Sequence, residues 1–187
     1  MFRFEIEGCA AACEGAGLWY EGNVKNDLVP VEVVGILPTG PQGFAVFLGN
    51  EEKVFVINVD SYVGRAIMMA LRGERNERPL THELVGLIFE GFAIAIDRVI
   101  INDLRNNTYF ARLLLHAESE VHKKMIEIDA RPSDCLTLAL QAKRPILVSR
   151  EVWDEVEDMG ELLEKMREAQ RKQQEPPDEP LFGGEVK

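Results

Sequence analysis

The side chains best suited to chemistry lie between residues 127 and 134. Glu127 and Asp129 alternate along a predicted strand, so their carboxylates point to the same face of that strand. Asp134 begins the helix that follows, and the free backbone N–H groups of a helix N-terminus bind anions. Carboxylates of this kind hold Mg²⁺ or Mn²⁺ where a phosphodiester bond is cut, and a nearby cation contacts the phosphate. We therefore predict Glu127, Asp129 and Asp134 as metal or water ligands, with Arg131 as the phosphate clamp.

A structural interpretation of the same residues stays open beside this one. Asp129, Ser133 and Asp134 are residue types that cap a helix, because a short side-chain oxygen accepts a hydrogen bond from an unpaired backbone N–H. Negative charge in the first helical turn also stabilises the helix. Arg131 then forms an ion pair with one of the carboxylates. Ser133 is a substrate contact in the first interpretation and a cap in the second.

Further candidates stand apart from this set. His82, just inside a predicted helix, could act as a base, although a histidine there is more often a solvated first-turn residue. Asp103 and Arg105 follow a strand, where functional loops often lie, and a surface turn explains them equally well. A cluster of four arginines could contact phosphates, but two interspersed glutamates favour a salt-bridged surface. The arginines are Arg65, Arg72, Arg75 and Arg78.

Hydrophobic periodicity predicts the elements that must position these residues. Two hairpins are indicated, over 44–59 and 109–128, by runs of β-branched and aromatic side chains. Asp60 or the serine after it is predicted to cap one helix, and Pro132 presets the first turn of another. Thr81 is predicted to cap a helix between the hairpins. A short closing strand is predicted after Pro145.

The hairpins belong to a predicted internal duplication, with copies at 31–73 and 97–142. Apolar positions recur with a shift of 66 residues in the early strands and 69 residues in the last strand and helix of each copy. A supersecondary unit used twice explains this pattern. We predict an α+β fold, in which a duplicated β-rich unit forms one mostly antiparallel or mixed sheet with packed helices and a C-terminal helix.

The residues after 150 differ in character from the body. Apolar side chains there are spaced 4, 3, 4 and 3 residues apart, which is the period of a coiled-coil seam; they are Val152, Val156, Met159, Leu163 and Met166. Because the seam is short, packing on the body is the first interpretation and a helix shared in a dimer is the second.

The net charge also differs between the body of the chain and the residues after 150. We predict an extension at 1–28, a domain at 29–150, a helix at 151–172 and a disordered acidic tail at 173–187. Residues 1–150 contain 16 Lys and Arg against 20 Asp and Glu, and residues 151–187 contain 5 against 12, so the net charge of −11 is −4 plus −7. The nearly balanced body carries no electrostatic footprint of a DNA-binding protein.

The rest of the sequence predicts a cytoplasmic protein that has no membrane partner. No apolar run reaches the ~20 residues that a spanning helix needs, and the charged, alternating residues after Met1 differ from a secretion signal. The three cysteines, Cys9, Cys13 and Cys135, give no disulfide framework, so we expect them to be reduced.

Four motifs follow one another within roughly residues 29–155: Arg78-Pro79-Leu80-Thr81-His82-Glu83-Leu84, Val99-Ile100-Ile101-Asn102-Asp103-Leu104-Arg105, Thr108-Tyr109-Phe110-Ala111-Arg112 and Glu127-Ile128-Asp129-Ala130-Arg131-Pro132-Ser133-Asp134. In this order they resemble the motifs of the bacterial and plant bifunctional nuclease family. The family is named for cleavage of both DNA and RNA, so the resemblance implies a nuclease with these substrates. His82, Arg105 and Arg112 lie in the motifs and are predicted substrate contacts. Asn106-Asn107 stand where many members carry an Asp-Gly turn.

Three functions remain open on the sequence. The first is a weak, metal-dependent nuclease that acts on DNA and RNA phosphodiester bonds. The second is a non-enzymatic homo-oligomeric scaffold or regulatory module, in which the carboxylates serve in caps and ion pairs. The third is a small-ligand sensor with a cleft between the two copies. We expect a homo-oligomer, most simply a dimer.

Overall fold

The computed structural model describes residues 28–40, 43–118 and 123–174. The elements in chain order are β1 (Leu28–Gly40), β2 (Gly43–Gly49), β3 (Val54–Asp60), α1 (Ser61–Arg72), α2 (Thr81–Gly91), β4 (Ile94–Arg105), β5 (Thr108–Glu118), β6 (Lys123–Ala130), α3 (Pro132–Ala142), β7 (Ile146–Ser149), α4 (Arg150–Glu155) and α5 (Gly160–Gln174). The predictions for the N-terminal extension before Leu28, for Cys9 and Cys13 and for the tail beyond Gln174 lie outside the described residues.

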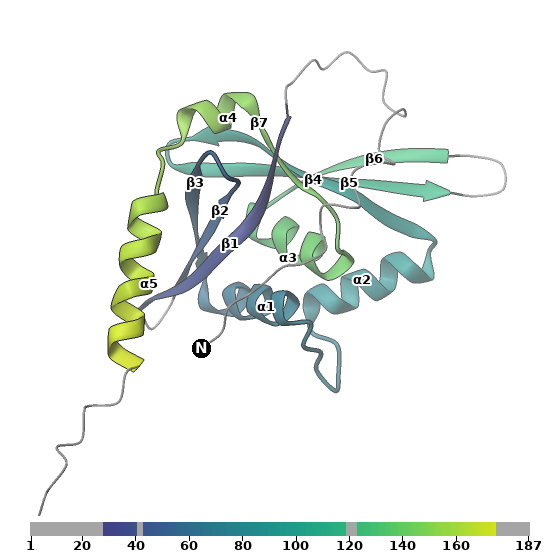
Figure 1. The fold of residues 1–187 in the computed structure, drawn as a ribbon. Coiled ribbons are helices and arrows are strands. Elements are labelled where there is room, and N and C mark those ends of the chain that lie inside the picture. The colour runs from purple at the N-terminus through teal and green to yellow at the C-terminus, as the bar shows by residue number, and fades with distance from the viewer. Residues whose placement is uncertain (1–27, 41–42, 119–122, 175–187) are drawn as a thin grey trace, which may run out of the picture.

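The seven strands form one mixed sheet in the order β3-β2-β1-β7-β4-β5-β6 (Figure 1). Neighbouring strands are antiparallel, with the exception of β7 and β4, which run parallel with Ile101 opposite Val148. The predicted α+β class, with a mixed sheet and a C-terminal helix, is confirmed. The internal duplication stays a prediction.

Local residues stabilise the ends of α1 and α3, the helices that follow the β2–β3 and β5–β6 hairpins. Asp60 caps α1, since its carboxylate accepts hydrogen bonds from the backbone N–H groups of Tyr62 and Val63 at 2.9 and 3.0 Å. Gly73, at a φ of 65°, ends α1 in a left-handed conformation that glycine adopts without a steric cost. Pro132 is the first residue of α3, a position whose N–H has no partner within the helix, so the N–H that proline lacks is not needed there.

The start of α2 corrects the prediction that Thr81 is the cap. Leu80 occupies the cap position, and Thr81 is the first helical residue. The carboxylate of Glu83 accepts a hydrogen bond from the backbone N–H of Leu80 at 2.8 Å. A carboxylate in the first turn thus satisfies a free backbone donor at the start of α2, and this donor is a different N–H group from the ones that a threonine cap would satisfy.

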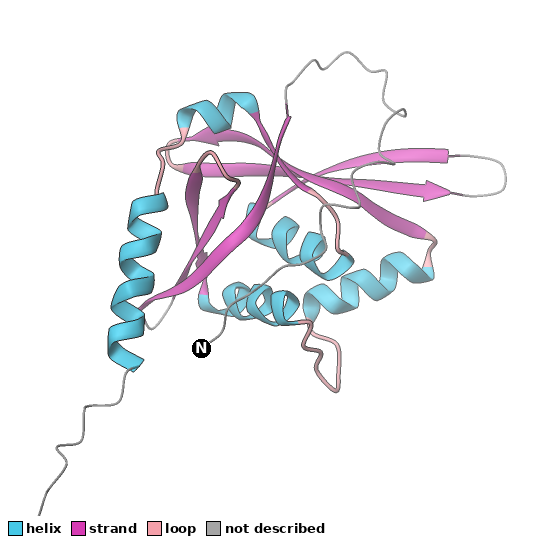
Figure 2. Cartoon of the chain, viewed as in Figure 1, coloured by secondary structure: helices cyan, strands magenta, loops and turns pink. Residues whose placement is uncertain are grey.

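The helices cover different parts of the sheet (Figure 2). The main core lies between one face of the sheet and helices α1 and α3, around fully buried side chains such as Ile67, Leu136 and Ala139. A second, smaller core lies on the opposite face of β1–β3, where Leu163 of α5 packs against Leu37 and Phe47. On β5 and β6, in contrast, side chains on that opposite face such as those of Phe110 and Met125 remain exposed.

The predicted C-terminal helix is divided into α4 and α5. Asp158 lies in the break and accepts hydrogen bonds from the backbone N–H of Gly160 at 3.0 Å and of Val54 at 3.1 Å. The apolar seam packs on the body of its own chain, because Val156 belongs to the main core and Leu163 to the second core. No helix in the described part of the chain is both long and apolar enough to cross a membrane.

An aromatic cluster joins elements that are far apart in the sheet order. The ring of Phe55 on β3 lies 5.8 Å from that of Tyr109 on β5 and 6.2 Å from that of Trp153 on α4. Four strands separate β3 from β5 in the sheet, so the sheet is curled strongly enough to bring the edge strand β3 close to β5. Lys53 stabilises the same region, because its Nζ donates hydrogen bonds to the carbonyl oxygens of Trp153 and Val156, both at 2.6 Å.

Candidate functional site

Three of the predicted residues meet around one carboxylate, and we call them the Asp134 cluster (His82, Arg131 and Asp134). Arg131 donates from Nε to Oδ2 of Asp134 at 2.9 Å and from Nη2 to Oδ1 at 3.2 Å. His82 Nε2 lies 3.0 Å from Oδ1 of the same carboxylate. Asp134 therefore bridges a cation at the N-cap of its own helix and an imidazole from a residue 52 positions earlier.

Two helix N-termini bring the cluster together. Arg131 is the N-cap residue of α3, and its carbonyl oxygen accepts hydrogen bonds from the backbone N–H groups of Asp134 and Cys135, both at 3.1 Å. His82 lies in the first turn of α2, whose Val85 and Phe89 pack against the main core. The apolar contacts of α2 thus fix the position from which His82 reaches α3.

The electrostatics of the cluster favour an ionised carboxylate. Partial burial by itself raises the pKa of Asp134, but the hydrogen bonds from Arg131 and His82, together with their charges, outweigh it and hold the pKa below its ordinary value. The same hydrogen bond raises the pKa of Arg131, and the negative charge of Asp60 adds to this effect. The His82 side chain is 14% exposed and that of Arg131 is 67% exposed, so the cluster has a sheltered imidazole beside an accessible cation.

The other two predicted carboxylates lie on the opposite face of the sheet. Glu127 forms an ion pair with Arg112, at 2.7 Å from Nη1 to Oε1, and Asp129 is the residue opposite Arg112 in the β5–β6 ladder. Their neighbours Ala111 and Leu113 point into the main core, which α3 covers. Because side chains alternate along a strand, Glu127, Asp129 and Arg112 point away from the helix that carries Asp134.

The remaining predicted residues occupy separate positions. Arg105, at the end of β4, forms an ion pair with Asp103, and its guanidinium lies 5.6 Å from the ring centroid of Phe110. The carbonyl oxygen of Ser133 accepts a hydrogen bond from Thr137 at 2.8 Å. Across the described ranges, no group of three His, Cys, Asp or Glu side chains is arranged to hold a metal ion.

A family model described as the bifunctional nuclease domain matches residues 46–159, which is more than half of the 187-residue chain. The chain belongs to the bifunctional nuclease domain family. The matched range contains the whole Asp134 cluster and the ion pair of Arg112 with Glu127.

Relatives of this bifunctional nuclease domain occur in bacteria and plants. An uncharacterized protein of Mycobacterium tuberculosis is 31% identical over 125 residues, which cover 65% of this chain and 72% of that protein. Bifunctional nuclease 1 of Oryza sativa subsp. indica is 31% identical over 86 residues, or 46% of this chain and 26% of the plant protein, and the Bifunctional nuclease of Oryza minuta matches to the same extent. The matched region is thus about a quarter of each plant protein.

The sequence predicts each member of the Asp134 cluster as a candidate residue, but it does not join His82 to Asp134. On the sequence alone, His82 is a separate candidate and Asp134 belongs with Glu127 and Asp129. Two features of the sequence relate His82 to Asp134. Both residues lie in the first turn of a predicted helix, and both lie in segments that belong to the family's motifs. Neither feature shows that the two helices pack side by side, which is a tertiary property.

The depressed pKa of Asp134 gives the domain a specific acid sensitivity. The folded state favours the ionised carboxylate, so the stabilisation is fully present above the unfolded pKa, near pH 4, and is lost as pH falls through the lower folded pKa. Asp134→Asn never ionises, so we expect it to destabilise the protein at neutral pH and to differ less from the wild type in strong acid. Urea unfolding of both proteins as a function of pH measures this; a constant difference would contradict it.

Proposed function

We propose that this protein hydrolyses phosphodiester bonds of DNA and RNA, with the Asp134 cluster at its reactive centre. Membership of the bifunctional nuclease domain family and the names of the plant relatives support the activity. The main observation in support of the site is that Asp134 forms hydrogen bonds with both His82 and Arg131. A carboxylate that orients an imidazole beside an exposed guanidinium provides a base and a phosphate-binding group in one place.

In the proposed reaction, Asp134 accepts the hydrogen bond from Nε2 of His82 and so leaves Nδ1 available to take a proton. A water oxygen forms a bond to phosphorus while His82 removes one of its protons. The bond between phosphorus and one sugar oxygen breaks, and that oxygen takes a proton from solvent. Arg131 donates to the phosphate oxygens, where negative charge accumulates. Because water is the nucleophile, the reaction needs no ribose 2′-hydroxyl, which accounts for activity on both DNA and RNA.

The predicted Mg²⁺ or Mn²⁺ site enters no step of this scheme. The carboxylates of Glu127 and Asp134 are each paired with an arginine, and they lie on different faces of the sheet. The residues as arranged therefore do not fit a three-carboxylate metal cage. A divalent cation, when bound to one carboxylate and the substrate phosphate, would neutralise charge on the phosphate. Metal dependence stays a prediction.

The experiment that tests this proposal is cleavage of single- and double-stranded DNA and RNA by the purified full chain, with Mg²⁺, Mn²⁺ or EDTA. We expect Asp134→Asn to lower the cleavage rate by about 100-fold. Asp103→Asn is a matched control, because Asp103 is also paired with an arginine and its side chain is 29% exposed against 30% for Asp134. Equal cleavage by the wild type and Asp134→Asn would remove the cluster from the reaction, and the EDTA samples decide metal dependence.

One observation supports the non-enzymatic module as a second candidate. Glu127, Asp134 and Asp103 all take part in ion pairs with arginines, as a purely structural role requires. This candidate predicts that the purified chain cleaves none of the four substrates under any metal condition, whereas the nuclease predicts cleavage of both DNA and RNA.

A further inference from the structure

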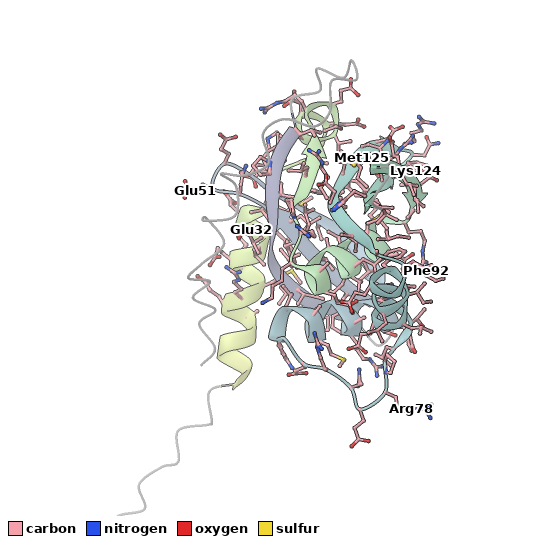
Figure 3. All side chains as sticks on the ribbon, turned by 90° about the vertical axis from the view of Figure 1, so that its right-hand side faces the viewer. Glu32, Glu51, Arg78, Phe92, Lys124 and Met125 are labelled. Atoms are coloured by element: carbon pink, nitrogen blue, oxygen red, sulfur yellow. The ribbon has the colours of Figure 1, made fainter. Side chains whose placement is uncertain are left out.

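Helix α2 presents an apolar stripe to solvent, formed by Leu84, Leu87, Ile88 and Phe92. Their exposed fractions are 49%, 52%, 47% and 75%. The spacing of three, four and eight residues from Leu84 places them along one side of the helix, with Phe92 directly after its last turn. Figure 3 shows Phe92 at the outer surface of the molecule.

The stripe is unusual because α2 is apolar on two sides. Val85 and Phe89 on the inner side pack against the main core, yet no residue of α2 is buried. The outer apolar side of a surface helix is ordinarily replaced by polar residues, so an apolar side that faces solvent needs another explanation. Exposed apolar patches of this kind mark interaction sites in folded proteins.

The chemistry of α2 selects the class of partner. The helix contains no Lys or Arg, and its charged residues are Glu83 and Glu90. Binding of nucleic acid depends on cations that contact phosphates, and binding to an anionic membrane surface depends on cations in the same way. The stripe therefore fits an apolar protein surface.

The size of the stripe fits a second copy of this chain. From their exposed fractions, the four side chains present roughly 400 Å² of apolar surface. A standard interface covers about 800 Å² on each partner, and in homodimers about 65% of it is apolar, or roughly 520 Å². One stripe facing another across a two-fold axis thus supplies most of the apolar area that a stable dimer needs.

We propose that two copies of this protein pair through the α2 stripe, as an α2–α2 contact about a two-fold axis. The seam of α5 is unavailable for this purpose, because Leu163 and Met166 already pack on the sheet of their own chain. His82 lies on the inner side of α2 and faces α3, so the contact leaves the Asp134 cluster outside the interface. The inference goes beyond the proposed function and does not depend on it.

Analytical ultracentrifugation of the full chain over a range of concentrations tests the proposal. The wild type is expected to be dimeric at micromolar concentrations. Leu87→Glu places a charge in the centre of the stripe and is expected to raise the dimer dissociation constant at least 100-fold. Leu162→Glu is the matched control, because Leu162 is 44% exposed on α5, and it is expected to leave the dimer unchanged.

A mixing experiment tests whether the partner is the same stripe. Leu87→Glu and Leu87→Lys proteins are each expected to be monomeric alone and to form a mixed dimer when combined, because opposite charges then meet across the axis. Circular dichroism establishes that the variants are folded, and if Leu87→Glu is not, the milder Leu84→Gln replaces it in the concentration series. A monomeric wild type at all concentrations, or a Leu87→Glu protein that remains dimeric, overturns the proposal.

Discussion

Replacement of His82 by glutamine is expected to lower the rate of nucleic-acid cleavage by about two to four orders of magnitude. The amide nitrogen of glutamine can take the place of Nε2 and keep the hydrogen bond to Asp134, which is 3.0 Å in the wild type. Glutamine cannot take up a proton from water, so the variant retains the geometry of the cluster and loses the base. Initial rates on single-stranded DNA and RNA at a fixed enzyme concentration measure the effect.

His116→Gln is the control for this experiment. His116 lies on β5 opposite Met125, on the face of the sheet away from α3, and is expected to have no role in cleavage. Both variants are expected to unfold at urea concentrations close to that of the wild type. If His82→Gln cleaves as fast as His116→Gln, the imidazole is not the base and the proposed reaction is wrong.

Truncation of Phe55 to alanine is expected to destabilise the protein by about 3–5 kcal/mol. Phe55 is 1% exposed, and its ring contacts those of Tyr109 and Trp153, so its removal leaves a cavity where β3 of the curled sheet meets β5 and α4. The loss is a large share of the roughly 5–15 kcal/mol that stabilises a domain. Equilibrium urea unfolding followed by far-ultraviolet circular dichroism measures the change.

Phe110→Ala provides the comparison for Phe55→Ala. Phe110 is 36% exposed and lies on the open face of the sheet beside Arg105, so its truncation is expected to cost less than about 1 kcal/mol. A Phe55→Ala protein that is as stable as Phe110→Ala would show that the aromatic cluster does not hold β3 against β5 and α4.

The sequence predicts those parts of the fold that local chemistry decides. The cap at Asp60, the proline at the start of α3 and the alternating apolar residues of the hairpins are each encoded within a few residues, and each predicted element is present. The sequence predicts the wrong cap for α2, because a threonine cap and a first-turn glutamate each satisfy a free N–H near the helix start, and the local pattern does not decide between the two starts.

The candidate site was predicted in composition but not in arrangement. Alternation along a strand correctly puts Glu127 and Asp129 on one face, but it does not say which face the next helix covers. The chain turns through Arg131 and Pro132 onto the core side of the sheet, and this carries Asp134 away from the other two carboxylates. The contact of Asp134 with His82 depends on the packing of α2 beside α3, for which a single sequence contains no periodic signal.

Strand β7 has a consequence for how the chain folds during synthesis. Its four residues lie between β1 and β4 and connect the β1–β3 half of the sheet to the β4–β6 half. They leave the ribosome after all six other strands, so until then β1 and β4 each expose an unpaired edge that can bind a strand of another nascent chain. The arrival of Ile146 to Ser149 pairs Leu28–Val31 of β1 and Val99–Ile101 of β4 with the same strand. Slower translation before this segment is therefore expected to prolong the aggregation-prone interval.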